Sequence, residues 1–111
     1  MTTAGERQMA FAKAAKVGDI AEGTCKGVTV NGKKLALYKV SGKFYATADE
    51  CNHRGGPLSE GSLSANEITC PWHGGKFDVC TGAPMGGPVH KNIEIFPVRL
   101  EGDDVEIDVE A

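Results

Sequence analysis

The chain has 111 residues, of which 41% are hydrophobic and 15 are glycine, and its net charge is −3. This length allows one domain with a modest core, and so many glycines suit a turn-rich all-β protein better than a helical one. The acidic charge argues against nucleic acid as a partner, because phosphate binding requires a basic face.

The first half of the chain predicts short antiparallel strands joined by tight turns. Strands are expected at 9–14, 25–30, 34–40 and 43–47. Asn31-Gly32 and Ser41-Gly42 favour two-residue hairpin turns, because these residue types tolerate a positive φ. The first half is therefore expected to form a β-meander, with at most one helical turn at 17–21.

The middle of the chain, residues 48–88, has a different composition. It contains four of the five prolines and most of the glycines. Only two short strands are expected there, at 67–70 and 76–79. Such a loop-dominated segment buries little apolar surface by itself, so we expect a metal centre to order it.

Strand character returns at 92–100 and 104–109, joined by a turn at Gly102-Asp103. The alternation of the first strand slips just before Pro97, which indicates a bulge or an edge position. Six of the fifteen acids lie between Glu101 and Glu110, with no base among them. We interpret this run as a solvated last strand rather than a docking patch.

The predicted architecture is a single all-β domain, residues 1–111, made of antiparallel sheets. Residues 1–47 and 89–111 are expected to form a basal β-domain. Residues 48–88 are expected to form an inserted, loop-rich, metal-binding subdomain.

The sequence also bears on the compartment. Residues 1–5 show no basic segment followed by an apolar run, so no secretory signal is expected, and no uncharged stretch is long enough to span a membrane. The expected compartment is the cytoplasm, where disulfides are rare. Four cysteines could still form two disulfides, but Cys51 and Cys70 each lie beside a histidine, which a disulfide does not need.

The main functional signal is two mixed pairs, Cys51-x-His53 and Cys70-x-x-His73. Thiolates select zinc, copper(I) or iron–sulfur centres, so the residue types alone do not separate a zinc site from a two-iron cluster. Zinc sites usually pair cysteine with cysteine and histidine with histidine, whereas each pair here mixes the two. If both cysteines bind one iron and both histidines the other, each loop contributes one ligand to each metal.

Neighbouring residues suit a cluster. Glycines follow both pairs and let backbone N–H groups turn toward bridging sulfides. Residues 82–88, Gly-Ala-Pro-Met-Gly-Gly-Pro, are expected to fold over the centre as a third loop.

These motifs resemble the Rieske [2Fe–2S] family. The match extends to Tyr45-Ala46-Thr47, Leu58-Ser59-Glu60-Gly61, Ile68-Thr69-Cys70-Pro71 and His73-Gly74-Gly75-Lys76-Phe77-Asp78. The resemblance implies one [2Fe–2S] cluster per chain, with Cys51 and Cys70 on the inner iron. His53 and His73 would hold the outer iron near the surface. It also implies antiparallel sheets with an inserted cluster-binding subdomain.

The sequence departs from the high-potential members of that family. Those members carry two further cysteines that bridge the ligand loops, and the corresponding positions here are Gly56 and Trp72. They also place a serine and a tyrosine as donors to sulfur, where this chain has Gly75 and Phe77. Hydroxyl donors stabilise the more negative, reduced cluster, so their absence predicts a low potential of about −150 mV.

The resemblance is to the Rieske ferredoxins that serve bacterial aromatic-ring dioxygenases in aromatic hydrocarbon catabolism. It implies a monomeric electron carrier, not an enzyme, that takes single electrons from a flavoprotein reductase and passes them to a terminal oxygenase. Transient docking is expected at the His53/His73 edge. A terminal oxygenase needs a further iron held by two histidines and a carboxylate, and only His90 remains for it.

Two alternatives stay open from the residues alone. One is the Rieske-like small subunit of a nitrite reductase, and the other is a structural zinc-binding module. Among the remaining residues, Cys25 and Cys80 are expected to be buried and unreactive, although a disulfide between them is not ruled out. Arg54 and Lys76 are either solvated or face a partner's acidic surface.

Overall fold

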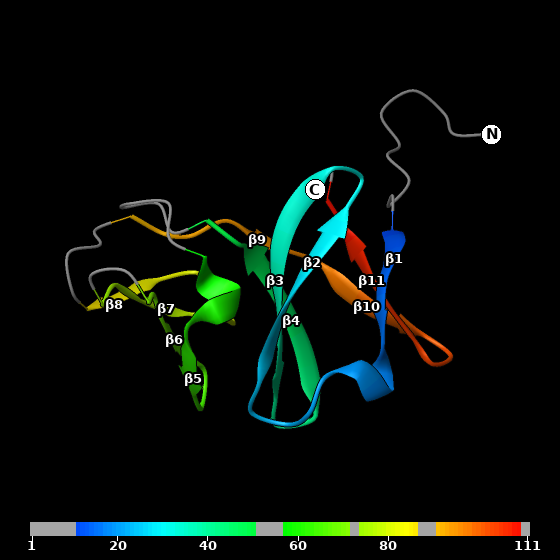
Figure 1. The fold of residues 1–111 in the computed structure, drawn as a ribbon, viewed down its shortest axis with the longest axis horizontal. Helices are drawn as coiled ribbons and strands as arrows, with labels where there is room; N and C mark the ends of the chain where they lie inside the picture. The colour runs from blue at the N-terminus through cyan, green and yellow to red at the C-terminus, as the bar shows by residue number, and fades with distance from the viewer. Residues whose placement is uncertain (1–10, 51–56, 72–73, 87–90, 110–111) are drawn as a thin grey trace.

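The computed structural model describes residues 11–50, 57–71, 74–86 and 91–109. Within these residues the chain forms eleven β-strands and two short 3₁₀ helices (Figure 1). In chain order they are β1 (Phe11–Lys16), η1 (Val17–Asp19), β2 (Cys25–Val30), β3 (Lys33–Val40), β4 (Lys43–Ala48), η2 (Leu58–Glu60), β5 (Ser62–Ser64), β6 (Glu67–Thr69), β7 (Lys76–Asp78), β8 (Pro84–Gly86), β9 (Ile95–Phe96), β10 (Val98–Glu101) and β11 (Asp104–Asp108). This confirms the all-β prediction. No helix in the described part of the chain is long and apolar enough to cross a membrane.

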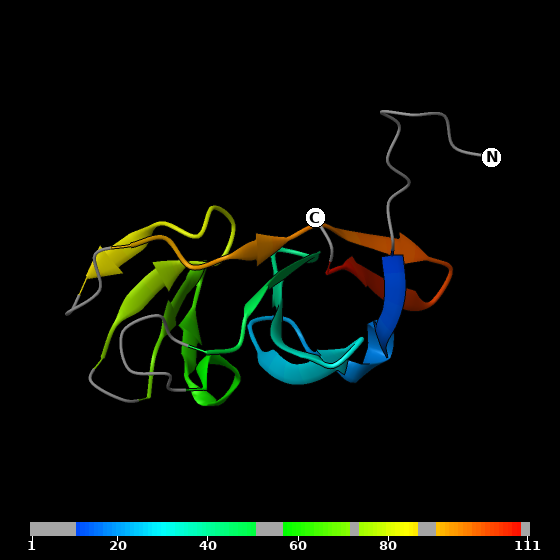
Figure 2. The same cartoon turned by 90° about the horizontal axis from the view of Figure 1, so that it is seen from above.

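The strands form three antiparallel sheets, in the orders β1-β11-β10, β2-β3-β4-β9 and β5-β6-β7-β8. The first two sheets make up one end of the molecule, and β5–β8 lie at the other (Figures 1 and 2). The third sheet is built from residues 62–86, inside the predicted subdomain. The boundaries of that subdomain, at residues 48 and 88, remain a prediction.

Both predicted hairpin turns are confirmed. Asn31 and Gly32 have φ of 50° and 81°, and Ser41 and Gly42 have φ of 52° and 77°. Each pair is therefore left-handed at both central positions, as the two-residue turn between β-strands requires. The meander comprises β2, β3 and β4, whereas the first strand, β1, pairs with β11 in another sheet.

Strand β3 separates two hydrophobic cores. The basal core contains Ala15, Ile20, Val30, Leu35, Leu37, Ala46, Phe96, Val105, Ile107 and Val109. The second core contains Ala36, Tyr38, Leu58, Ile68, Cys70, Phe77, Val79 and Ile93. Alternate residues of β3 thus enter different cores, because successive side chains of a strand point to opposite faces. The four residues 35–38 are all buried, which explains their uninterrupted apolar run.

The middle of the chain contains more strand than the sequence predicted. The predicted strands correspond to β6 and β7, but β5, β8 and η2 were not expected. Strand β5 has one apolar residue, Leu63, between two serines, so it carries almost no hydrophobic pattern. Strand β8 begins at Pro84, and a proline is tolerated at the first position of an edge strand. Part of the expected third loop is therefore a strand, and residues 87 and 88 lie outside the described residues.

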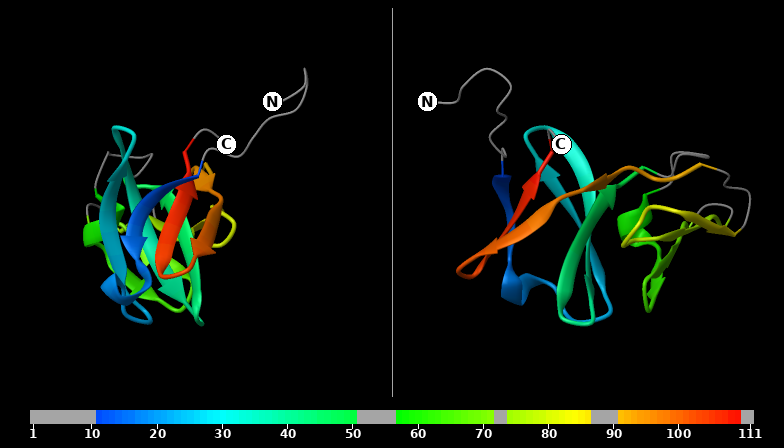
Figure 3. Two further views of the ribbon diagram at one scale, coloured as in Figure 1. Left: turned by 90° about the vertical axis from the view of Figure 1, so that its right-hand side faces the viewer. Right: turned by 180° about the vertical axis from the view of Figure 1, so that it is seen from behind.

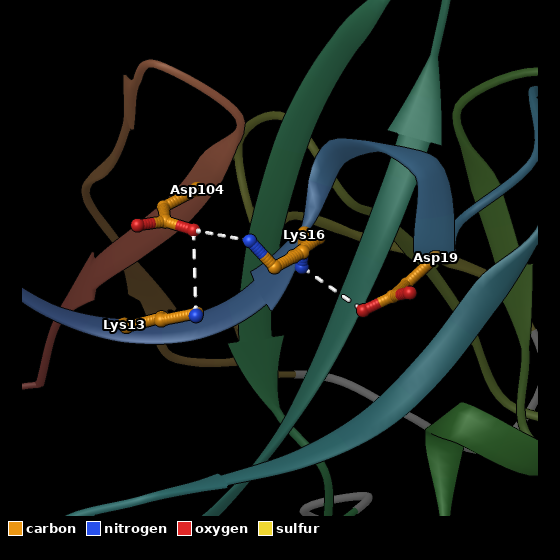
Figure 4. A network of polar contacts seen from close by, with 4 residues as sticks. All are labelled: Lys13, Lys16, Asp19 and Asp104. Carbon is orange, nitrogen blue, oxygen red and sulfur yellow. Dashed lines mark hydrogen bonds and ion pairs between the residues drawn. The ribbon is translucent and has the colours of Figure 1, made fainter.

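The interpretation of the acidic last strand as solvated holds only where the run begins. Glu101 and Asp103 are exposed, Asp104 and Glu106 are partly buried, and Asp108 is buried. Strand β11 is the central strand of its sheet, between β1 and β10 (Figure 3, left). An Asp104 carboxylate oxygen lies 3.5 Å from the Nζ atoms of both Lys13 and Lys16 (Figure 4). The Glu106 carboxylate accepts a 2.7 Å hydrogen bond from Arg99 Nε on β10. The bases that balance this strand come from its two neighbours, which the local sequence does not show.

The chain changes sheet at Pro97. Strand β9, before it, pairs with β4, and β10, after it, pairs with β11. Both are edge strands of their sheets, which confirms the prediction of an edge position around this proline. The turn at 102–103 then joins β10 to β11 as expected, with Glu101 opposite Asp104.

Candidate metal centre

The segment that carries Cys51 and His53 is held at both ends by described residues, although both of these predicted ligands lie outside them. Glu50 and Pro57 form an antiparallel bridge across its ends. The Asp49 carbonyl accepts a 2.7 Å hydrogen bond from the backbone N–H of Leu58. The Asp49 carboxylate accepts a second, 2.8 Å long, from the N–H of Ser59. Asp49 thus fixes where the chain leaves β4 and where it enters η2.

The second motif spans the turn between β6 and β7. Cys70 directly follows β6, and its N–H donates a 2.7 Å hydrogen bond to the carbonyl of Gly75. Gly74 has φ of 72°, a conformation that favours glycine. The Cys70 side chain is only 2% exposed and belongs to the second core. His73 lies outside the described residues.

The flanks of the two motifs lie against each other. Ser62 of β5 pairs with Thr69 of β6, one residue before Cys70. Gly61, which links η2 to β5, packs so closely on the Thr69 carbonyl that a Cβ atom would overlap it. Leu58 of η2 also shares the second core with Cys70. The end of the first motif is therefore anchored beside the beginning of the second.

These contacts fit a cluster held between two loops. Cys70 supplies a soft thiolate in an apolar environment, which is the donor type that iron–sulfur centres use. Gly75 is buried, and its carbonyl accepts the hydrogen bond from the Cys70 N–H. The complete set, Cys51, His53, Cys70 and His73, stays a prediction, because the structure describes only Cys70.

Sequence reasoning missed Asp49, and it named Gly61 in a motif without finding its role. Asp49 bonds to residues nine and ten positions away, so no short capping pattern reveals it. Gly61 has an ordinary φ of −81°, and its need for glycine comes from the nearby Thr69 backbone rather than from its own conformation. The roles of both residues are seen only in contacts between separate segments of the chain.

The other described cysteines do not form a disulfide with each other. Cys25 is half-buried, and its thiol donates a 3.3 Å hydrogen bond to the Ser59 carbonyl. Burial raises the pKa of Cys25, with a further contribution from the Asp49 carboxylate, so the thiol stays protonated and unreactive. Cys80 is also half-buried, and its hydrogen bond with Tyr45 is the main reason why the pKa of Tyr45 is raised.

Lys76, three positions after His73, is largely solvated. Its Nζ lies 3.8 Å from a Glu67 carboxylate oxygen on the adjacent strand, and its side chain is 45% exposed. A pair this exposed contributes little to stability. Arg54 and His90 lie outside the described residues, so what was expected of Arg54 stays a prediction.

Replacing Asp49 by alanine should loosen the first motif. The change removes the oxygen that accepts the Ser59 N–H, and we expect a loss of about 1–2 kcal/mol in the free energy of unfolding. Asp49→Asn is the matched control, because its side-chain carbonyl retains an acceptor and should lose less than half as much. Thermal unfolding followed by circular dichroism measures both. Equal losses in the two variants would show that this hydrogen bond is not what holds the motif.

Known proteins resemble this chain along most of its length. The model of the Rieske [2Fe–2S] domain matches residues 10–97. The ferredoxin component of a naphthalene 1,2-dioxygenase system from Pseudomonas aeruginosa is 50% identical over 91 residues, which are 82% of this chain and 88% of that protein.

Solved structures agree with these sequence matches. A complex of reduced oxygenase and oxidised ferredoxin in carbazole 1,9a-dioxygenase contains a chain with a TM-score of 0.85 and 37% identity, covering 91% of this chain and 94% of that one. A ferredoxin of Sphingomonas yanoikuyae B1 has a TM-score of 0.84 and 32% identity, covering 88% of this chain and 97% of that one.

Proposed function

Because this chain belongs to the Rieske [2Fe–2S] family, we propose that it carries single electrons to the terminal oxygenase of an aromatic-ring dioxygenase system. It holds a Rieske-type [2Fe–2S] cluster and is an electron-transfer component rather than the oxygenase. The observation that carries the proposal is the packing of Gly61 on Thr69, which brings the flanks of the two cysteine–histidine motifs together.

In this proposal, Cys51 and Cys70 hold the inner iron, and His53 and His73 hold the outer iron. The cluster supplies a one-electron couple when it is bound. Cys70 contributes a thiolate from within the second core, and the hydrogen bond from its N–H to Gly75 fixes the turn that carries it. Asp49 fixes the flanks of the other motif.

A flavoprotein reductase is the proposed electron donor, and docking is proposed at the His53/His73 edge. Such encounters are small and transient, as electron-transfer interfaces are, and a monomer suits them.

We place the protein in the cytoplasm, since cysteines paired with histidines suit a reducing compartment. The relatives named as dioxygenase ferredoxins favour this carrier over the small subunit of a nitrite reductase. The match to the Rieske [2Fe–2S] domain favours an iron–sulfur cluster over a structural zinc site.

Reconstitution tests the proposal directly. The purified chain is combined with a flavoprotein reductase and with the oxygenase component of a naphthalene 1,2-dioxygenase system, the system of its 50% identical relative. Product should form in proportion to added chain and should be negligible without it. Product formation at the same rate in the absence of the chain would overturn the proposal. In gel filtration, stable co-elution with a nitrite reductase would favour that alternative instead.

The midpoint potential should lie near the low end of the Rieske range, about −150 mV. The reason is the lack of hydroxyl donors at Gly75 and Phe77, both of which are buried. A redox titration followed by EPR of the reduced protein measures it. A clearly positive midpoint would show that other groups stabilise the reduced state.

A further inference from the structure

A β-bulge lies opposite the second ligand motif. Lys76 of β7 pairs with Gly86, but the next residue, Phe77, pairs with Pro84. Met85 is therefore an extra residue on β8, without a partner position on β7. Bulges bend a strand and turn a side chain in a new direction, and they are over-represented beside functional sites.

The Met85 side chain is 49% exposed. Among the described residues, the other large exposed hydrophobic side chains are Ile95 and Leu100, and both belong to the other two sheets, although Ile95 lies beside Gly82, just before β8. Met85 is thus the exposed large hydrophobic residue of the β5–β8 sheet, as far as the structure describes it. Its strand lies at the far end of the molecule from β10, which carries Leu100 (Figures 1 and 2).

Among the described residues beside Met85, the charges are balanced. Lys76 runs alongside β8, with its Cδ 3.8 Å from the point that a Cβ on Gly86 would occupy. The Lys76 charge is balanced by Glu67 on the next strand. A partner that approaches β8 therefore meets an apolar side chain with a mixed-charge rim. This arrangement is typical of the centre of a protein–protein interface.

We propose that Met85 is the central apolar contact through which this chain docks on its terminal oxygenase. The inference rests on the proposed function and adds to it a residue and a recognition chemistry. The sheet that carries Met85 also positions Cys70, so docking there brings the oxygenase next to the cluster-binding end. A related ferredoxin fold has been solved in complex with its oxygenase, so a surface of this fold serves such a partner. The oxygenase is expected to present an apolar patch at its electron-accepting site.

Methionine suits a contact that must form and release quickly. Its side chain is unbranched and polarisable, so it adapts to a partner surface without strict shape complementarity. In small interfaces a few central residues contribute most of the binding energy. Because about half of the Met85 side chain is exposed, replacing it should leave the fold intact.

The test compares Met85→Lys with Leu100→Lys, a change of the same charge at the opposite end, where the side chain is 52% exposed. Stopped-flow reduction of the naphthalene 1,2-dioxygenase oxygenase component gives the dissociation constant from its dependence on concentration. We expect Met85→Lys to raise this constant about tenfold, Met85→Leu to restore most of the affinity, and Leu100→Lys to change it less than twofold. The visible spectrum and midpoint potential should be the same in all variants.

An unchanged dissociation constant in Met85→Lys would overturn the inference. Equal weakening by Leu100→Lys would also overturn it, since the cause would then be the added charge. Failure of the wild-type chain to reduce the oxygenase is a separate outcome, and it would count against the proposed function itself.

Discussion

Replacing Cys70 by alanine should abolish the cluster and, with it, electron transfer. Cys70 follows β6 in the second core and is 2% exposed, so solvent has little access to the position of its thiolate. Because a bound metal centre contributes its binding free energy to folding, the variant should also unfold at a lower temperature. Iron and acid-labile sulfide per chain, the visible spectrum and EPR after reduction measure the loss.

Cys80→Ala is the matched control for this prediction. Cys80 is a half-buried cysteine that packs against the same second core and hydrogen-bonds Tyr45, but it is not a proposed ligand. The control should keep the full content of iron and sulfide. A reducible centre in Cys70→Ala, or its loss in both variants, would refute the role of Cys70. His73→Ala should likewise lose the cluster.

Gly61→Ala should be strongly destabilising. Its Cβ would overlap the Thr69 carbonyl, which is backbone of a paired strand and cannot rotate away. Overpacking of this kind costs about 3 kcal/mol, which corresponds to a fall of about 13 °C in the melting temperature of a chain of this length. Displacement of the Thr69 backbone should also separate the flanks of the two motifs. The iron and sulfide content should therefore fall together with the stability.

Gly86→Ala provides the control for Gly61→Ala. The nearest atom to a Cβ at this position is Lys76 Cδ, 3.8 Å away, which is an ordinary van der Waals distance. Scanning calorimetry of the two variants, each with its cluster content measured, separates the effect of the overlap from a general intolerance of alanine. A Gly61→Ala protein as stable as Gly86→Ala would disprove the close contact.

The sequence predicted best where structure is decided locally. The hairpins at 31–32 and 41–42 depend on residue types at two adjacent positions, and both formed as expected. Pro97 indicated an edge position for a similar reason, since proline lacks the donor that a central strand needs. These features require no knowledge of which distant strand is the neighbour. The single strand predicted at 92–100 is wrong, because the chain forms two short strands there, in different sheets.

The sequence predicted least where partners come from far along the chain. Strand β11 looked solvated because its balancing bases lie on β1 and β10, as with Lys13 and Asp104. Strand β8, with proline and glycine, lacks β propensity and forms by pairing with β7. In the site, the ligand pairs could be recognised from their spacing. Asp49 and Gly61, which position their flanks, could not, because their contacts lie nine or more residues away or with another strand.

The position of β3 between two cores limits how this protein can be divided. Leu35 and Leu37 complete the basal core, while Ala36 and Tyr38, on the same strand, complete the second. Cutting out the inserted segment would expose Tyr38, whose hydroxyl now bonds to Thr47 inside the protein. The cluster-binding part therefore cannot be transplanted to a new host as an independent module. A recipient scaffold would have to supply a strand with apolar residues on both faces.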